Sequence, residues 1–251
     1  MKILLTNDDG YTSPGILALY NTLCMKHEVK LIAPEGERSA IGHGITLHEP
    51  IRMKPVELNG KGSGYAVSGT PVDCVKLGLF TLYNSVPDLV ISGINPGSNA
   101  GINLNYSGTV GAAREAALNN IMSLAVSVQQ GDIMDFDGIA VFVSRFIDQV
   151  MLEGFPAGTF LNINVPDVPV WKTNGIKITR QASNNLSKAF ENRADSKDNA
   201  CFWYAKVPSC DSEPDTDIHA LSQNYISITP VRCDVTDYTV LAEIDHLEKF
   251  E

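Results

Sequence analysis

Two adjacent aspartates, Asp8 and Asp9, directly follow a short apolar run and are the residues best suited to chemistry. The run, residues 2–6, reads K-I-L-L-T and is typical of a strand buried on both faces of a parallel sheet. Ligands of open α/β sheets bind just beyond the carboxyl ends of such strands. Two carboxylates there need a counter-charge, and a hard divalent cation such as Mg²⁺ or Mn²⁺ prefers oxygen ligands. The alternative is a solvated turn, because N-D-D-G is also made of common turn residues.

Two later loops carry oxygen ligands that could share this cation. Ser39 lies in the loop after an expected strand at residues 28–33, and Asn95 follows an expected strand at residues 88–92. If these strands are parallel neighbours, all three loops open on one edge of the sheet. Two carboxylates, a hydroxyl and an amide oxygen would leave the rest of an octahedron to water or substrate, as is usual for Mg²⁺. Taken singly, both residues are ordinary loop residues, and a turn or a cap is the alternative for each.

A further segment, N-Y-S-G-T-V-G-A-A at residues 105–113, predicts the start of an anion-binding helix. Ser107 or Thr109 would cap a helix whose free backbone N–H groups, with the positive end of the helix dipole, favour a phosphate. Gly108 lets the backbone approach a ligand closely. The alternative is a plain capped helix packed through glycine and alanine. A metal at one strand end and an anion cradle at a neighbouring one together favour a phosphoester substrate.

Strands and helices must alternate along the chain for these loops to meet. The apolar patterns predict strands at residues 2–6, 28–33, 88–92, 123–128 and 159–165, and helices at 14–26, 70–83, 107–119 and 138–152. Ser13 is the expected N-cap of the first helix, and Pro71 suits the first turn of the second. This alternation is typical of an α/β fold with a doubly wound, mainly parallel sheet. The long, glycine-rich connection at residues 36–69 interrupts it, and connections of this length are usually functional.

The pattern changes after Pro166, which divides the chain into a core at residues 1–168 and a β-rich C-terminal arm at 169–251. In the arm, short antiparallel strands are expected at residues 176–181, 201–207 and 225–231, followed by a helix at 238–250. The intervening segments are too polar to form a core of their own. Projecting strands expose edges, and exchange of the arm between identical subunits would cover them.

Composition limits the classes of protein and of partner. The chain has 251 residues, of which 44% are hydrophobic and 19% charged, so a packed core is expected and disorder is not. A net charge of −10 argues against binding a nucleic-acid duplex or an anionic membrane. The five cysteines are widely spaced without a C-x-x-C, which indicates reduced thiols and a cytoplasmic protein. The apolar start is too short for a signal peptide, and no stretch approaches the length of a membrane span.

Seven motifs in one order resemble the SurE family (survival protein E), whose members are metal-dependent 5′-nucleotidases. The blocks are I-L-L-T-N-D-D-G-Y (3–11), A-P-E-G-E-R-S-A-I-G-H-G-I-T (33–46), S-G-T-P-V-D-C-V-K-L (68–77), P-D-L-V-I-S-G-I-N-P-G-S-N-A-G (87–101), Y-S-G-T-V-G-A-A-R-E-A-A (106–117), I-T-R-Q-A (178–182) and N-Y-I-S-I-T-P-V (224–231). They span nearly the whole chain, which is far more specific than a single motif.

The resemblance implies a Rossmann-like three-layer sandwich with a C-terminal arm exchanged in a homodimer or homotetramer. It implies hydrolysis of nucleoside 5′-monophosphates to nucleoside and phosphate, with 3′-nucleotides and short polyphosphate as further substrates. It also implies one divalent metal ion, Mg²⁺ or Mn²⁺, per subunit.

Carried over by position, the family's metal ligands fall on Asp8, Asp9, Ser39 and Asn95. The phosphate-binding residues fall on Ser107, Gly108 and Thr109, with Asn7 beside the aspartates as a further phosphate contact. Asp8 and Ser107 are the expected catalytic residues. The family often has an acidic, glycine-rich stretch before the Y-S-G-T turn, whereas residues 102–105 read I-N-L-N here, which leaves the base preference open.

Two other protein classes and two possible nucleophiles are the alternatives at this point. A haloacid-dehalogenase-like phosphatase would carry a second aspartate two residues after Asp8, where this chain has Gly10. A non-catalytic nucleotide-binding or sensor protein is the other alternative, although no G-x-G-x-x-G follows the first strand and no Walker lysine motif is present. A metal-activated water with Asp8 as base is the favoured nucleophile, and covalent attack by an aspartate is the alternative.

Overall fold

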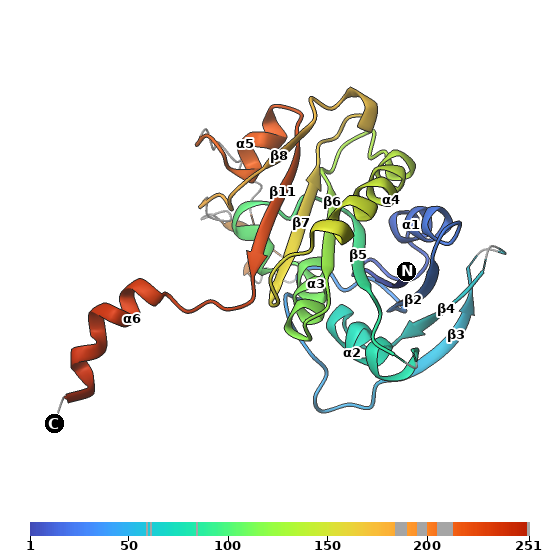
Figure 1. Ribbon diagram of the computed structural model, residues 1–251, viewed down its shortest axis with the longest axis horizontal. Helices are drawn as coiled ribbons and strands as arrows, with labels where there is room; N and C mark the ends of the chain where they lie inside the picture. Colours follow the sequence, from blue (N-terminus) through green and yellow to red (C-terminus); the bar gives the residue numbers. More distant parts are fainter. Residues whose placement is uncertain are drawn as a thin grey trace.

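A nine-stranded sheet in the order β3-β4-β2-β1-β5-β6-β7-β11-β8 forms the centre of the molecule (Figure 1). The computed structural model describes residues 1–251 except 59, 61, 84, 184–189, 195–199, 205–212 and 250–251. The strands of this sheet are β1 (Lys2–Thr6), β2 (Glu28–Pro34), β3 (Met53–Glu57), β4 (Ser63–Val67), β5 (Leu89–Pro96), β6 (Ser123–Val128), β7 (Thr159–Val165), β8 (Ile176–Ile178) and β11 (Ile226–Arg232). The six strands from β4 to β7 run parallel, so their carboxyl ends share one edge.

Helices cover both faces of the sheet and give the predicted three-layer α/β sandwich (Figure 1). Helices α1 (Pro14–Leu23) and α4 (Phe136–Glu153) pack together on one face, and α2 (Pro71–Thr81) and α3 (Gly108–Leu118) on the other. Successive side chains of a strand point to opposite faces. Accordingly, Ile3 and Leu5 join the apolar cluster with α1 and α4, and Leu4 joins the cluster with α2 and α3. Burial on both faces is why β1 is apolar along its length.

Local sequence explains how two of these helices begin. Thr70 caps α2 in a reciprocal capping box with Asp73, and Pro71 occupies the first turn as predicted. Ser13 stands at the N-cap position of α1, but its hydroxyl accepts no hydrogen bond from that helix. It accepts one from Asn7 Nδ2 at 2.7 Å instead, so the expected cap serves the turn after β1.

Strand β5 extends four residues beyond its predicted end at residue 92 and carries Asn95 within the strand. Its pairing with β6 shifts register between Ser92 and Asn95. Gly93, at φ +138°, makes this possible, because a Cβ there would lie 2.2 Å from the carbonyl oxygen of Val126. A bulge of this kind redirects the side chains that follow it. Local strand signals do not reveal it, since the sequence G-I-N-P-G reads as a loop.

Two segments differ from the sequence-based expectations. The connection at residues 36–69 contains an antiparallel hairpin, β3 and β4, that extends the sheet. Strands β8 and β11 belong to the main sheet and not to a separate arm: β11 pairs antiparallel with β7, and β8 pairs parallel with β11, where an antiparallel strand was expected. The reason is that β7 would otherwise leave an unpaired edge, and residues 226–229 of β11 are buried on both faces. Their mixed apolar and hydroxyl side chains conceal this burial in the sequence.

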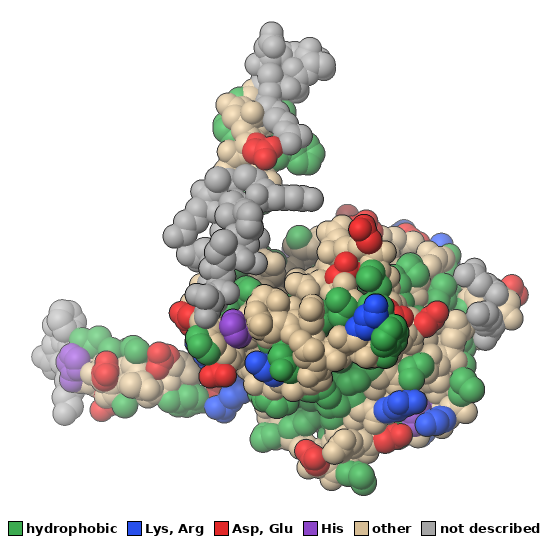
Figure 2. Space-filling view, turned by 90° about the horizontal axis from the view of Figure 1, so that it is seen from above, with side chains coloured by type: hydrophobic (Ala, Val, Ile, Leu, Met, Phe, Trp, Pro, Cys, Tyr) green, Lys and Arg blue, Asp and Glu red, His purple; other side chains and the backbone are tan. Residues whose placement is uncertain are grey.

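Helix α5 (Asp217–Ser222) packs against β11, whereas the other C-terminal elements project from this body (Figures 1 and 2). Strands β9 (Phe190–Ala194) and β10 (Ala200–Tyr204) form a separate two-stranded hairpin, and residues 205–207 of the expected strand 201–207 lie outside the described residues. Helix α6 (Tyr238–Ile244) has no buried residue and continues into a 3₁₀ turn at Asp245–Lys249. Within the described residues, no helix combines the length and apolar character needed to cross a membrane.

Candidate active site

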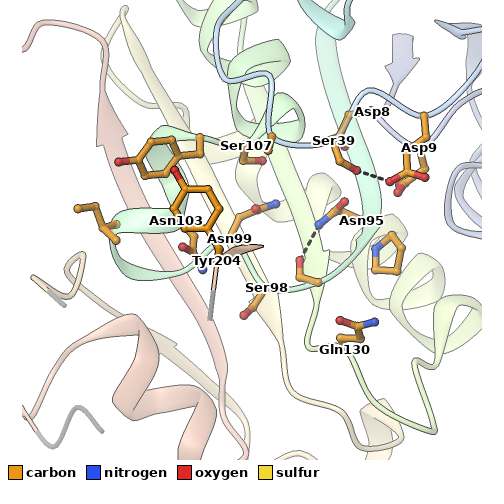
Figure 3. Close-up of a pocket in the computed structure, with 16 residues that line it drawn as sticks. Asp8, Asp9, Ser39, Asn95, Ser98, Asn99, Asn103, Ser107, Gln130 and Tyr204 are labelled. Carbon is orange, nitrogen blue, oxygen red and sulfur yellow. Dashed lines mark hydrogen bonds between the residues drawn. The ribbon is translucent and has the colours of Figure 1, made fainter. Parts of the chain in front are cut away.

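A cavity of about 1070 Å³ opens at the carboxyl ends of the parallel strands (Figure 3). It brings together five of the predicted site residues, Asp8, Asp9, Ser39, Asn95 and Ser107. Three other predicted residues, Asn7, Gly108 and Thr109, lie beside it but do not line it. The parallel-neighbour argument is therefore confirmed for the loops after β1, β2 and β5, because β2, β1 and β5 are adjacent.

Asp8 is a buried carboxylate held by the first turn of α3. Its Oδ1 atom accepts a hydrogen bond of 2.5 Å from the hydroxyl of Thr109. Burial raises the pKa of Asp8 above its ordinary value, an effect that this hydrogen bond opposes. Gly108 permits the contact between helix and strand end, because a Cβ there would lie 2.9 Å from the Cβ of Asp8. Gly108 and Thr109 thus hold Asp8 in place, and Thr109 uses its hydroxyl on Asp8.

Asp9 is a partly buried carboxylate with an oxygen that lacks a hydrogen bond from the described residues. Its Oδ2 atom is buried and accepts no hydrogen bond from the described residues. Burial, followed by the negative charges of Asp8 and Glu37, raises the pKa of Asp9 to about 7. A buried carboxylate oxygen that accepts no hydrogen bond from the described residues and lies beside like charges is suited to binding a cation. No group of three or more His, Cys, Asp or Glu side chains in the described part of the chain could hold a metal by itself. The candidate donors are therefore the mixed carboxylate, hydroxyl and amide oxygens that suit Mg²⁺ or Mn²⁺.

We expect the metal-free protein to lose stability as the pH rises, in a way that depends on Asp9. A carboxyl group with a folded pKa near 7 and an ordinary unfolded pKa of 3.8 binds more protons when folded between these values. The contribution of Asp9 to the free energy of unfolding is fully present below about pH 4 and is lost as the pH rises through 7. Denaturant unfolding in EDTA between pH 5 and 8 should show Asp9→Asn less pH-dependent than wild type and more stable at pH 8. Parallel pH profiles of the two proteins would contradict this account.

Ser39, Asn95 and Glu37 complete the polar end of the cavity. The Ser39 hydroxyl donates a hydrogen bond of 2.5 Å to Oε1 of Glu37, and Asn95 Nδ2 donates one of 2.6 Å to the carbonyl of Gly97 (Figure 3). With its NH₂ group engaged in this way, Asn95 keeps its Oδ1 oxygen as an acceptor or ligand. Glu37 was not predicted as a site residue, although it lies two positions before Ser39 in the same loop.

Ser107 is the N-cap of α3 and lines the cavity. Its Oγ accepts a hydrogen bond of 3.1 Å from the backbone N–H of Val110, which leaves the hydroxyl proton to be donated elsewhere. The side chain therefore caps the helix while offering a donor at the positive end of the helix dipole. This is the chemistry expected of a phosphate-binding turn.

Asn7 has a different position from the one predicted. Its side chain is fully buried, with Nδ2 donating to the carbonyl of Gly10 at 3.0 Å and Oδ1 accepting from the N–H of Gly10 at 3.2 Å. Both ends of the amide are used to form the turn that presents the two aspartates. Asparagine side chains commonly close such turns on their own backbone, so the structure gives Asn7 a supporting role.

A buried charge network fixes the loop that carries Ser39. Glu115 of α3 is 4% exposed, and its carboxylate lies 2.9 Å from His43 Nε2 and 2.6 Å from Lys76 Nζ. Burial raises the pKa of Glu115, but hydrogen bonds from His43 and Lys76 outweigh this effect and lower it overall. The loop also lies against α3 at Gly111, where a Cβ would be 2.4 Å from the carbonyl oxygen of Gly42. The sequence gives no local signal for the Glu115 network, since His43 and Lys76 lie 72 and 39 residues before Glu115.

Sequence reasoning related residues 102–105 to the base preference, but it did not predict Tyr106, Gln130 or Tyr204 as cavity residues. Ile102, Asn103, Tyr106, Gln130 and Tyr204 of strand β10 all line the cavity, and Asn103 and Tyr204 lie on the side away from the two aspartates. Tyr106 was visible as the residue before the Ser-Gly-Thr turn, but Tyr204 lies almost 100 residues further along the chain. Only the folded structure brings these two aromatic residues to one cavity.

Comparisons with known proteins agree with this architecture. The family model "Survival protein SurE" matches residues 3–188. A protein named 5′-nucleotidase SurE from Desulfatibacillum aliphaticivorans is 48% identical over 97% of this chain and 97% of its own. One of the same name from Syntrophobacter fumaroxidans is 44% identical over 96% of this chain and 97% of its own.

A solved structure shows the same fold. The crystal structure of the Sure protein from Aquifex aeolicus superposes with a TM-score of 0.86 at 37% identity, and the match covers 99% of this chain and all of the other. The family match extends over well more than half of the chain, and the similarity to relatives over nearly all of it. The chain therefore belongs to the SurE family.

Proposed function

We propose that this protein is a 5′-nucleotidase that hydrolyses nucleoside 5′-monophosphates to nucleoside and phosphate. The observation that carries this proposal is the shared cavity, which is lined both by two adjacent carboxylates and by Ser107, the N-cap of α3. Proteins named 5′-nucleotidase SurE match nearly the full length of the chain. A cation beside Asp8 and Asp9 and an anion at Ser107 together describe a site for a phosphoester.

We propose that Asp8, Asp9, Ser39 and Asn95 hold one divalent cation, Mg²⁺ or Mn²⁺. When bound, such an ion would neutralise the phosphoryl oxygens and favour the deprotonated form of water. Asp8 orients the attacking water and accepts its proton, because a carboxylate at this position can contact both the cation and the water. Ser107 donates a hydrogen bond to a phosphoryl oxygen, and Thr109 keeps Asp8 in position. The proton that Asp8 takes from water goes to the departing oxygen of the nucleoside.

Phosphate release from AMP tests the proposal directly. We expect the intact protein to release phosphate with Mn²⁺ or Mg²⁺ and to lose this activity in excess EDTA. Binding of AMP without phosphate release would favour the alternative, a nucleotide-binding or sensor protein.

We further propose 3′-AMP and a short polyphosphate as secondary substrates, measured in the same assay. A cytoplasmic location and the absence of a nucleic-acid-duplex or membrane partner stay predictions from the cysteine pattern and the charge of −10.

We also propose that the protein is a homodimer or homotetramer. The projecting hairpin and α6 expose large apolar side chains that have no cover in one chain, among them Phe202, Trp203, Leu241 and Ile244. Burying such apolar surface against a second copy of the chain lowers the free energy. Closed symmetry then limits the assembly to a fixed number of subunits.

Light scattering of the intact protein at micromolar concentration should therefore give at least twice the chain mass of 27.2 kDa. Removal of residues 233–251, which include α6, should reduce the assembly or its solubility. A fully active species with the mass of one chain would contradict the proposal.

A further inference from the structure

The cavity has two chemically different ends. Asp8, Asp9 and Glu37 make one end anionic, whereas Asn103 and Tyr204 lie on the other side of the cavity. Ile102, which also lines the cavity, belongs to the same 3₁₀ turn as Asn103, and Tyr106, a further lining residue, is the C-cap of that turn. Figure 3 shows Tyr204 and Asn103 on the side away from the two aspartates, with Ser98 and Asn99 between them. Typical ligand pockets measure about 300–1,000 Å³, so about 1070 Å³ leaves room for far more than a phosphate group.

Both tyrosines are unusually accessible for residues that line a cavity. Tyr204 is 72% exposed and Tyr106 is 49% exposed. Tyr204 is the one cavity residue supplied by the described part of the β9–β10 hairpin. Burial in the core of the chain therefore does not account for either ring, whereas stacking on a flat ligand would.

The supports of the two rings are fixed. Tyr204 pairs across the hairpin with Phe190, and their ring centroids lie 4.8 Å apart at 37°. The carbonyl of Tyr106 accepts a hydrogen bond of 2.8 Å from Gly42 N–H, and its own N–H donates to the carbonyl of Asn103 at 3.0 Å. Tyr106 also directly precedes Ser107, so its ring is one residue from the proposed phosphate donor.

The wall between the rings is held by the C-terminal part of the fold. The N–H of Gly101 donates to Asp217 at 2.8 Å, and its carbonyl accepts from Gln181 at 2.9 Å. These bonds anchor the 3₁₀ turn Gly101–Asn105, which carries Ile102 and Asn103 into the cavity. A preorganised apolar and amide surface beside exposed aromatic rings favours a flat heteroaromatic ligand.

We propose that Tyr204 and Tyr106 form a stacking site for the nucleobase of the substrate, with Asn103 facing its polar edge. This inference rests on the proposed nucleotidase function and assigns its base-binding residues. Stacking tolerates different bases, because every base presents a π-face. The site should therefore favour nucleotides over sugar phosphates without selecting one base strictly.

Steady-state kinetics on the intact protein with Mn²⁺ can test this assignment with AMP and ribose 5-phosphate, which lacks a base. Loss of one stacking partner corresponds to roughly a tenfold effect. We expect Tyr204→Ala and Tyr106→Ala each to lower the AMP to ribose 5-phosphate ratio of kcat/KM about tenfold, mainly through KM for AMP. Tyr204→Phe keeps the aromatic face and should retain the ratio. Trp171→Ala is the matched control, because Trp171 is an exposed aromatic residue that does not line the cavity.

The possible outcomes separate the two proposals. A wild-type enzyme that hydrolyses AMP, with both alanine variants keeping the wild-type ratio, overturns the stacking site alone. An equal loss on both substrates also overturns it, because that result indicates damage to the phosphate end or to the fold. A wild-type protein that releases no phosphate from AMP overturns the nucleotidase function and the stacking site together.

Discussion

Asp8→Asn is expected to abolish phosphate release while leaving the protein folded. The substitution removes the charge that the cation needs and the group proposed to take the proton from water. General-base catalysis alone contributes about 10²–10⁴-fold, so a loss of at least about 10³-fold is expected at saturating Mn²⁺. The amide can still accept the hydrogen bond from Thr109 Oγ1, which preserves local packing. Because burial already disfavours the charged form of Asp8, the metal-free variant should be at least as stable as wild type.

A surface carboxylate provides the matched control for this result. Glu57 is an exposed residue of β3 that does not line the cavity, so Glu57→Gln changes the net charge equally without touching the site. Phosphate release and the free energy of unfolding in EDTA should be measured for both variants. Turnover of Asp8→Asn within tenfold of wild type would remove Asp8 from the proposed mechanism.

Ser107→Ala is expected to lower kcat by about 10²–10³-fold, equivalent to about 2.7–4 kcal/mol. The hydroxyl is the donor aimed at charge that develops on phosphorus-bound oxygen, so its loss should act on the transition state. The same variant also loses the N-cap of α3, which costs about 1 kcal/mol of stability. Affinity for Mn²⁺, measured by calorimetry, should stay close to wild type, since Ser107 is not among the proposed metal ligands.

Asp135→Ala separates the catalytic loss from the capping loss. Asp135 caps α4 by accepting from the N–H of Gly138, and it does not line the cavity. It should lower stability without a comparable loss of kcat. If Ser107→Ala instead loses Mn²⁺ binding and keeps its rate, Ser107 belongs with the metal ligands and not with the phosphate donors.

The sequence predicted the helices and strands whose bounds are determined by neighbouring residues. Strands β1, β6 and β7 begin and end at the predicted residues, because each is a short run rich in apolar residues that is largely buried. The metal-ligand candidates lie together at the cavity because parallel strands share one carboxyl edge. Local patterns missed the hairpin of β3 and β4, in which Lys54, Pro55 and Glu57 are exposed. They also missed residues defined by distant partners, such as Glu115 and Tyr204. Which side chains meet across 70 or more residues depends on the packed structure, and no local period encodes it.

Under the proposed assembly, the folding of helix α6 depends on the concentration of the protein. Helices shorter than about 12–15 residues are marginal in water, and α6 with its 3₁₀ continuation spans only Tyr238–Lys249. Tyr238, Leu241, Ile244 and Leu247 are all exposed, so the chain itself contributes little to its folding free energy. Under the proposed assembly, dilution below the dissociation constant would unwind this segment while the nine-stranded sheet persisted. Circular dichroism and amide exchange in α6 would then report subunit association, and a measured helix content would be meaningful only together with the concentration at which it was recorded.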